Sequence, residues 1–192
     1  GNTTITWSEP GVYKIGVSPG FREHGYSGQE ASKIVDVLQW GGIDWADMTS
    51  MFREADRLDD FSATDTPDLN NVTSMRSMFY EATWFNGSLN DWDVSNVEDL
   101  GGTFRDARHF NRSLADWNTS SVTNLRNTFR GADRFNNNVT SWDTSNVKDM
   151  LGTFEGTDAF NQPIGSWDTG EVTTMHGTFK DTGAFDQPIG SW

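Results

Sequence analysis

The feature that most constrains this chain is a sequence that repeats itself every 25 residues. Residues 145–169 read SNVKDMLGTFEGTDAFNQPIGSWDT, and residues 120–144 before them read SSVTNLRNTFRGADRFNNNVTSWDT. A fixed period of this length is typical of a stack of repeated units in which each unit contacts only its neighbours. We therefore predict two buried columns of side chains, one of Phe and one of Trp. Their members are Phe79, Phe104, Phe129, Phe154 and Phe179, and Trp92, Trp117, Trp142 and Trp167.

The chain divides into two regions. Residues 1–45 do not repeat, and alternating β-branched and aromatic residues at 3–7 and 12–17 predict a hairpin. Residues 31–40 predict a second short segment, either strand or helix. The repeats fill residues 46–192 as about six coils, of which the first is irregular. Because the end of a repeat array needs a cap, we interpret residues 1–45 as an N-terminal cap containing short strands, with an independent small β domain as the alternative.

Within one repeat the hydrophobic period changes. Val97, Leu100, Phe104 and Ala107 are spaced as on one face of a short helix. The residue that precedes Leu100, or its equivalent in another coil, is a good helix N-cap in every case. These residues are Ser74, Asp99, Asn124, Asp149 and Thr174. The stretch 117–119 alternates as a very short strand does. The prediction is an α/β solenoid that stacks short parallel strands and short helical turns.

An Asn follows the second Phe of most repeats. Because a side-chain amide at a bend can bond backbone groups of its own coil and of the next, we predict a structural ladder. Its members are Asn86, Asn111, Asn136 and Asn161, with Asp186 at the end.

The consensus V-x-x-M/L-x-x-x-F-x-x-A-x-x-F-N-x-x-L/I-x-x-W-D-x-S-N resembles the BspA-like leucine-rich repeats of bacterial surface proteins, in their DUF285 type. The resemblance covers about residues 45–192 and departs from the pattern at Asn118, at Asp186 and at Gly170-Glu171. It implies a right-handed leucine-rich-repeat-like stack, export to the cell surface and adhesion to other cells or matrix. It implies neither catalysis nor a common ligand.

Composition excludes several functions. The net charge of −14 makes nucleic acid and anionic membranes poor partners. No apolar run approaches the roughly 20 residues that span a bilayer, so no membrane insertion is expected. The absence of cysteine excludes disulfides and thiolate zinc sites. There is no H-E-x-x-H motif, and a row of equal carboxylates lacks the two distinct environments that acid–base catalysis needs. We expect no enzyme activity, no cofactor and no metal.

The candidate ligand-binding residues flank the Trp of each coil. If Trp92 and Val94 point inward, the residues between and beside them point outward. The set is Asp91, Asp93, Ser95, Asp116, Asn118, Ser120, Ser141, Asp143, Ser145 and Asp168. These residues either cap the following turn, contact a ligand or bind calcium, although no D-x-D-x-D-G calcium loop is present. As ligand contacts they favour cationic peptides or glycan hydroxyls and disfavour anions.

The expected function is a non-catalytic ligand-binding module of an extracellular, cell-surface bacterial adhesin. Its partner would be a protein, peptide or glycan of a host or neighbouring cell, and the alternative is a structural spacer in a large surface protein. Trp84 is an aromatic residue that the repeat does not explain. Because Trp192 closes a coil without a cap, we also expect further repeats or a cap beyond it, and weak self-association through this open edge.

Overall fold

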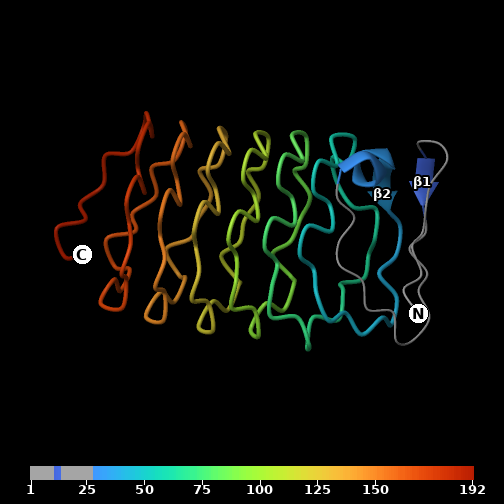
Figure 1. Ribbon diagram of the computed structural model, residues 1–192, viewed down its shortest axis with the longest axis horizontal. Helices are drawn as coiled ribbons and strands as arrows, with labels where there is room; N and C mark the ends of the chain where they lie inside the picture. The colour runs from blue at the N-terminus through green and yellow to red at the C-terminus, as the bar shows by residue number, and fades with distance from the viewer. Residues whose placement is uncertain (1–10, 14–27) are drawn as a thin grey trace.

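The computed structural model describes residues 11–13 and 28–192. The chain winds through successive coils that lie side by side from the N-terminal to the C-terminal end (Figure 1). Regular elements in the described residues occur only near the start: β1 (Gly11–Tyr13), the 3₁₀ helix η1 (Gly28–Lys33) and β2 (Ile34–Val37). Strands β1 and β2 pair in parallel. The segment 31–40 thus holds the end of a helix and a strand, whereas most of the predicted hairpin lies outside the described residues.

The predicted α/β solenoid is wrong. From residue 38 to 192 the chain forms neither helix nor strand, and its coils are joined by isolated parallel bridges. The bridges are Asp44–Asp68, Ser74–Asp99, Asp99–Asn124, Asn124–Asp149 and Asp149–Thr174. The last four fall on the residues expected to begin helices, and the expected strand at 117–119 forms no bridge. The repeat is therefore built from turns, and it lacks the sheet and helical layer of an α/β stack.

A run of tight turns replaces the predicted helix. The Thr103 N–H donates to the Leu100 carbonyl three residues back at 3.1 Å, whereas the Gly102 N–H donates to the next coil, to the Arg126 carbonyl, at 2.8 Å. Gly102 and Asp106 have φ of +65° and +58°. A positive φ late in a four-residue turn is typical of type II geometry, and no α-helix accommodates it. Apolar residues spaced by three and four fit both a short helix and a run of tight turns, so this spacing alone did not distinguish the two structures.

Four of the five residues predicted as helix caps do cap a backbone N–H, but that of a turn. The Asp99 Oδ1 accepts the Gly101 N–H at 2.7 Å, and the Asn124 Oδ1 accepts the Arg126 N–H at 2.9 Å. The Asn124 amide also donates to the Asp99 Oδ1 of the preceding coil at 2.8 Å. Each side chain therefore closes its own turn and ties two coils together.

The aromatic columns are confirmed in the core. Phe79, Phe104, Phe129, Phe154 and Phe179 stack with centroids 5.5 to 5.8 Å apart. Trp117, Trp142, Trp167 and Trp192 stack at 6.1 to 6.2 Å. Trp92 packs differently, edge-on against Trp40 and face-on against Phe61. The Trp142 indole N–H donates to the Leu114 carbonyl of the previous coil at 3.0 Å, so even the buried indole is satisfied.

The Asn ladder is confirmed as well. The side-chain oxygen of each Asn accepts the backbone N–H of the equivalent residue in the following coil, at 2.9 to 3.0 Å. A buried Thr adds a second set of bonds: the Thr128 hydroxyl is shared between the Leu125 and Leu100 carbonyls at 2.8 and 3.1 Å. Both sets fix the position of one coil against the next, and with it the surface rows discussed below.

Candidate functional site

We call the row Asp93, Asn118, Asp143 and Asp168 the acidic turn row. Its members alternate with buried neighbours as predicted: Trp92 and Val94 are buried and Asp93 between them is exposed. Asp143 lies in the same way between buried Trp142 and Thr144. The row therefore lies on the surface, at one residue per coil.

The acidic turn row caps turns. Each Oδ1 accepts the N–H two residues ahead: Ser95 at 3.1 Å, Ser120 at 3.2 Å, Ser145 at 3.0 Å and Gly170 at 2.8 Å. The hydroxyls and N–H groups of Ser95 and Ser145 lower the pKa of Asp93 and Asp143. In the described residues no bond engages the Oδ2 atoms of Asp93, Asp143 and Asp168. Ligand contact by this row stays a prediction.

The predicted residues just before the Trp have separate surroundings. Asp116 bonds the Asn90 side chain, and the Ser141 hydroxyl donates to the Ala115 carbonyl at 2.7 Å. Asp91 lines a small hollow of about 130 Å³ beside Trp92. The structure thus spreads the predicted site over several coils without gathering it into one pocket. Within residues 11–13 and 28–192 no group of three or more His, Asp or Glu side chains is placed to hold a metal ion.

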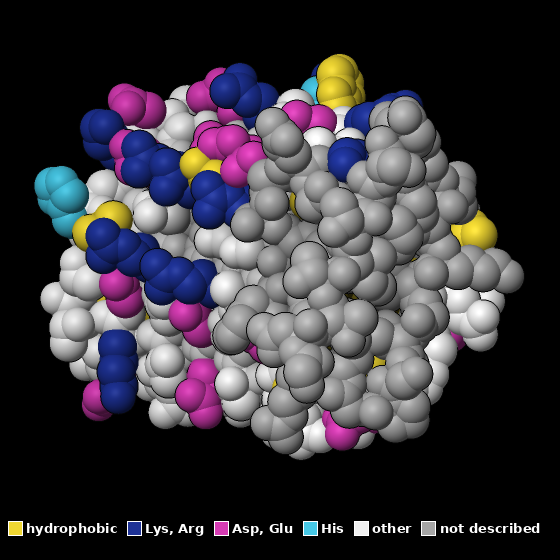
Figure 2. Space-filling model, turned by 45° about the vertical axis from the view of Figure 1, so that its right-hand side comes forward, with side chains coloured by type: hydrophobic (Ala, Val, Ile, Leu, Met, Phe, Trp, Pro, Cys, Tyr) yellow, Lys and Arg dark blue, Asp and Glu magenta, His cyan; other side chains and the backbone are white. Residues whose placement is uncertain are grey.

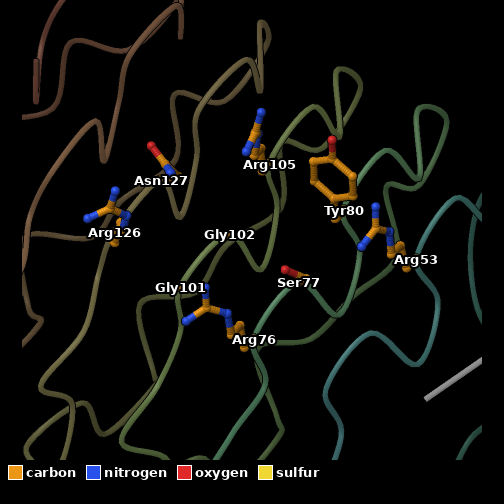
Figure 3. Close-up of a pocket in the computed structure, with 9 residues that line it drawn as sticks. All are labelled: Arg53, Arg76, Ser77, Tyr80, Gly101, Gly102, Arg105, Arg126 and Asn127. Atoms are coloured by element: carbon orange, nitrogen blue, oxygen red, sulfur yellow. The ribbon is translucent and has the colours of Figure 1, made fainter. Parts of the chain in front are cut away.

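A different feature, an arginine groove, is the larger hollow, with a volume of about 190 Å³ (Figure 3). Four of its nine lining residues are arginine and none is acidic. The lining residues are Arg53, Arg76, Ser77, Tyr80, Gly101, Gly102, Arg105, Arg126 and Asn127. They come together because stacking places residues 25 positions apart on neighbouring coils. Arg76 and Arg126 lie two coils apart, with Gly101 at the equivalent position between them.

Tyr80 lies between two arginines of the groove. The guanidinium carbons of Arg53 and Arg105 lie 4.6 and 5.0 Å from the centroid of its ring, and Figure 3 shows the ring between the two side chains. Cation–π attraction of this kind is worth about 0.5–1 kcal/mol at an exposed site. The neighbouring Glu81 raises the pKa of Tyr80, so the phenol stays neutral at physiological pH. Packing on the neutral Tyr80 ring holds both guanidinium groups in place, and both remain positively charged.

Each arginine of the groove has one acidic neighbour outside the lining. The closest approaches are Arg53–Glu54 at 3.0 Å, Arg105–Asp106 at 3.3 Å, Arg126–Asp149 at 3.4 Å and Arg76–Asp99 at 3.8 Å. A guanidinium carries five N–H donors, so these single contacts leave most of them available. The Arg76 side chain is 57% exposed and makes no hydrogen bond in the described residues.

The floor of the groove is kept open by small residues. A Cβ on Gly101 would lie 2.8 Å from the Asp99 Oδ1 that caps its turn, so a side chain at this position would require the Asp99 side chain to shift. The Asn127 side-chain oxygen is buried without a partner and lies toward Gly152. The Ser77 hydroxyl and the side-chain NH₂ group of Asn127 make no hydrogen bond in the described residues, so these two groups, unlike the buried Asn127 oxygen, remain available to a ligand.

Sequence reasoning missed this groove. Position 76 holds Arg, Gly, Arg, Leu and His in successive coils, so the repeat pattern gives no signal for arginine there. The net charge of −14 also drew attention to the acidic residues. A charge count for each repeat position would have shown the cations clustering, and Figure 2 shows Lys and Arg gathered over part of the surface among Asp and Glu.

Trp84, the aromatic that the repeat does not explain, is 56% exposed. Its ring stacks on His109 of the next coil at 4.2 Å, and the His109 Nδ1 lies 3.0 Å from the Thr83 carbonyl oxygen. Trp84 is not among the residues that line the arginine groove.

Comparison with known proteins gives one family. A family model described as "Mycoplasma protein of unknown function, DUF285" matches residues 46–150 and 113–192. Neither the curated proteins nor the solved structures contain a match. In the described residues, no helix has the length and apolar character needed to cross a membrane.

Proposed function

Because this chain belongs to the DUF285 family, whose description leaves the function open, we propose a function from its geometry. The chain is a non-catalytic ligand-binding module of a bacterial cell-surface adhesin, and its ligand lies across several coils. The observation that carries this proposal is the arginine groove, a hollow that four arginines and no acidic residue line.

The stack itself does not need these arginines. The position of Arg76 is filled by Leu151 and His176 in later coils, and the position of Arg105 by Glu155. The core is built from other positions, and its aromatic columns continue regardless of which residue occupies these sites. Like charges gathered at one place repel each other, and only part of this cost is offset by the acidic neighbours. A cluster of this kind therefore favours a binding role.

The surface location rests on the resemblance of the repeats to BspA-like surface proteins. A structural spacer is the alternative function, because a stack of coils with a continuous core holds two ends apart whatever its surface carries. The two functions differ in one respect. A spacer is indifferent to the residues that line the groove, whereas a binding module depends on them.

The test compares the wild-type chain with an Arg76→Leu/Arg126→Leu double variant on arrays of glycans and peptides. Leu occupies the equivalent position 151, so the variant should keep its melting temperature. Each charge-assisted hydrogen bond lost costs about 1.5–3 kcal/mol, so the bound ligand should weaken at least tenfold. Arg134→Ala, which removes a charge outside the groove, is the matched control. If the wild type binds nothing on either array, the spacer function replaces this proposal.

A further inference from the structure

We infer that the arginine groove binds a single carboxylate presented on an otherwise neutral sugar chain, that is, an acidic sugar unit. This inference rests on the proposed ligand-binding function and names the ligand class of the same site. It differs from the expectation, drawn from the acidic turn row, that anions are disfavoured.

The charge and shape of the lining point to an oxyanion. All the charged residues of the groove are arginine, whose planar fork of N–H donors matches a carboxylate in a bidentate manner. Because Arg53 and Arg105 both lie within 5.0 Å of the Tyr80 ring centroid, their guanidinium carbons are at most about 10 Å apart. The Tyr80 ring fills the space between these two groups, so the guanidinium best placed to accept a carboxylate in the groove is that of Arg76, which is 57% exposed and makes no hydrogen bond in the described residues.

The surroundings of the groove favour a compact anion over a polyanion. The chain carries a net charge of −14, and Glu54, Asp99, Asp106 and Asp149 lie directly beside the four arginines. A long polyanion would leave the groove and meet these carboxylates, at a cost in Coulomb energy. A single carboxylate gains the attraction of the groove and avoids that repulsion.

The rest of the lining favours a sugar over a peptide. No aliphatic side chain lines the groove, so it offers no pocket for the apolar anchors that commonly hold peptides. The Ser77 hydroxyl and the side-chain NH₂ group of Asn127 are neutral hydrogen-bonding groups that suit sugar hydroxyls, whereas the N–H groups of Gly101 and Gly102 are already bonded within the stack. At about 190 Å³ the hollow is smaller than the roughly 300–1,000 Å³ of sites that enclose a whole drug-sized ligand. The groove therefore holds one sugar unit of a longer sugar chain.

The experiment measures binding of the whole chain, by calorimetry, to two matched pairs of probes. One pair is an oligosaccharide ending in glucuronic acid and the same oligosaccharide with its carboxylate reduced to the alcohol. The other pair is sialyllactose and lactose. We expect at least one acidic probe to bind at least tenfold more tightly than its neutral partner, and its affinity to fall as salt is raised.

Variants locate the interaction. Arg126→Lys keeps the charge but loses the bidentate fork, and Arg76→Leu removes one guanidinium group; each should weaken the acidic probe several-fold. Arg134→Ala should leave it unchanged. Thermal unfolding of each variant shows whether it has kept the fold, and a conservative Arg76→Gln variant replaces Arg76→Leu if the latter unfolds.

The contrary outcomes are distinct. Equal binding of acidic and neutral sugars, with loss of both in the groove variants, overturns the carboxylate inference and leaves the proposed function standing. Tighter binding of a heparin fragment or of an acidic peptide than of either acidic probe also overturns it, in favour of a polyanion or a peptide ligand. Absence of binding to these probes overturns the inference, and if the wild-type chain also fails on the full glycan and peptide arrays, the proposed function fails with it.

Discussion

The side-chain oxygen of Asn136 accepts the backbone N–H of Asn161, which lies one coil further along the chain, at 2.9 Å. The same oxygen accepts the Gln162 side-chain amide at 2.9 Å, and the Gln162 amide also reaches the Asn136 carbonyl at 2.8 Å. One amide thus holds both the backbone and a side chain of the neighbouring coil. Because the bond from the backbone N–H recurs at Asn86, Asn111 and Asn161, it links the stack at the bend as the aromatic columns link it in the core.

Asn136 should therefore be sensitive to the loss of its acceptor. Replacement by Ala leaves the Asn161 N–H without its partner and should lower the free energy of unfolding by about 1–3 kcal/mol. Asn136→Asp keeps an acceptor oxygen at this place and should cost less. Urea denaturation of the two variants gives the comparison, and equal losses would show that the acceptor oxygen at this position does not stabilise the stack.

Position along the stack should decide the cost of removing a Phe. Phe129 is fully buried between Phe104 and Phe154, whereas Phe179 in the last coil is only partly buried. Phe129→Ala should cost about 3–5 kcal/mol and Phe179→Ala clearly less, because the second substitution leaves a smaller enclosed cavity. The measurement is chemical denaturation of both variants. Similar losses at the two positions would contradict a stack in which each coil depends on its neighbours.

The capped carboxylates of Asp93 and Asp143 should make stability depend on pH. Their pKa values are lowered in the folded state, so their contribution is present above the unfolded pKa near 3.8 and is lost as the pH falls through the lower folded value. The variant Asp93→Asn/Asp143→Asn keeps the capping oxygen, as Asn118 does naturally, but cannot be protonated. Its melting temperature should fall less than that of the wild type between pH 5 and pH 2.

The control for this comparison is Glu171→Gln, which removes an exposed carboxylate that makes no hydrogen bond in the described residues. Its pH profile should follow that of the wild type. If the double Asn variant also follows the wild type, the serine hydroxyls and N–H groups do not stabilise the two carboxylates. The same double variant tests the acidic turn row as a ligand site, because its turns remain capped while both charges are gone.

The last coil should promote weak self-association, as the sequence led us to expect. Met175 is 41% exposed, although the equivalent Met150 is fully buried. In the inner coils the corresponding N–H groups donate to the next coil, as from Met150 to Thr174, whereas the Met175 N–H makes no backbone bond in the described residues. An open backbone edge beside apolar side chains favours pairing with a second copy.

Light scattering over a range of concentrations measures this association. The Met175→Glu variant places like charges on both copies and should remain monomeric where the wild type associates. A wild type that stays strictly monomeric at high concentration would contradict the expectation.

The sequence alone was sufficient for the periodic features. The 25-residue step determined the Phe and Trp columns, the Asn ladder and the alternation of exposed Asp93 between buried Trp92 and Val94. The columns and the ladder depend only on a residue meeting its own equivalent one coil away, and the alternation depends only on neighbours in the sequence. Periodicity therefore predicts such contacts even when the backbone conformation of the coil is assigned wrongly.

The tertiary structure decided what periodicity does not encode. The apolar spacing around Phe104 fits a helix, but the positive φ at Gly102 and Asp106 and the bonds to the next coil produce turns. The arginine groove likewise joins different repeat positions, such as Arg76 and Tyr80, with Arg53 of an irregular coil in which the step is 27 residues. Whether such side chains meet depends on the turn that each coil makes and on the coil spacing, and both are set by hydrogen bonds between neighbouring coils, which are absent from any single repeat.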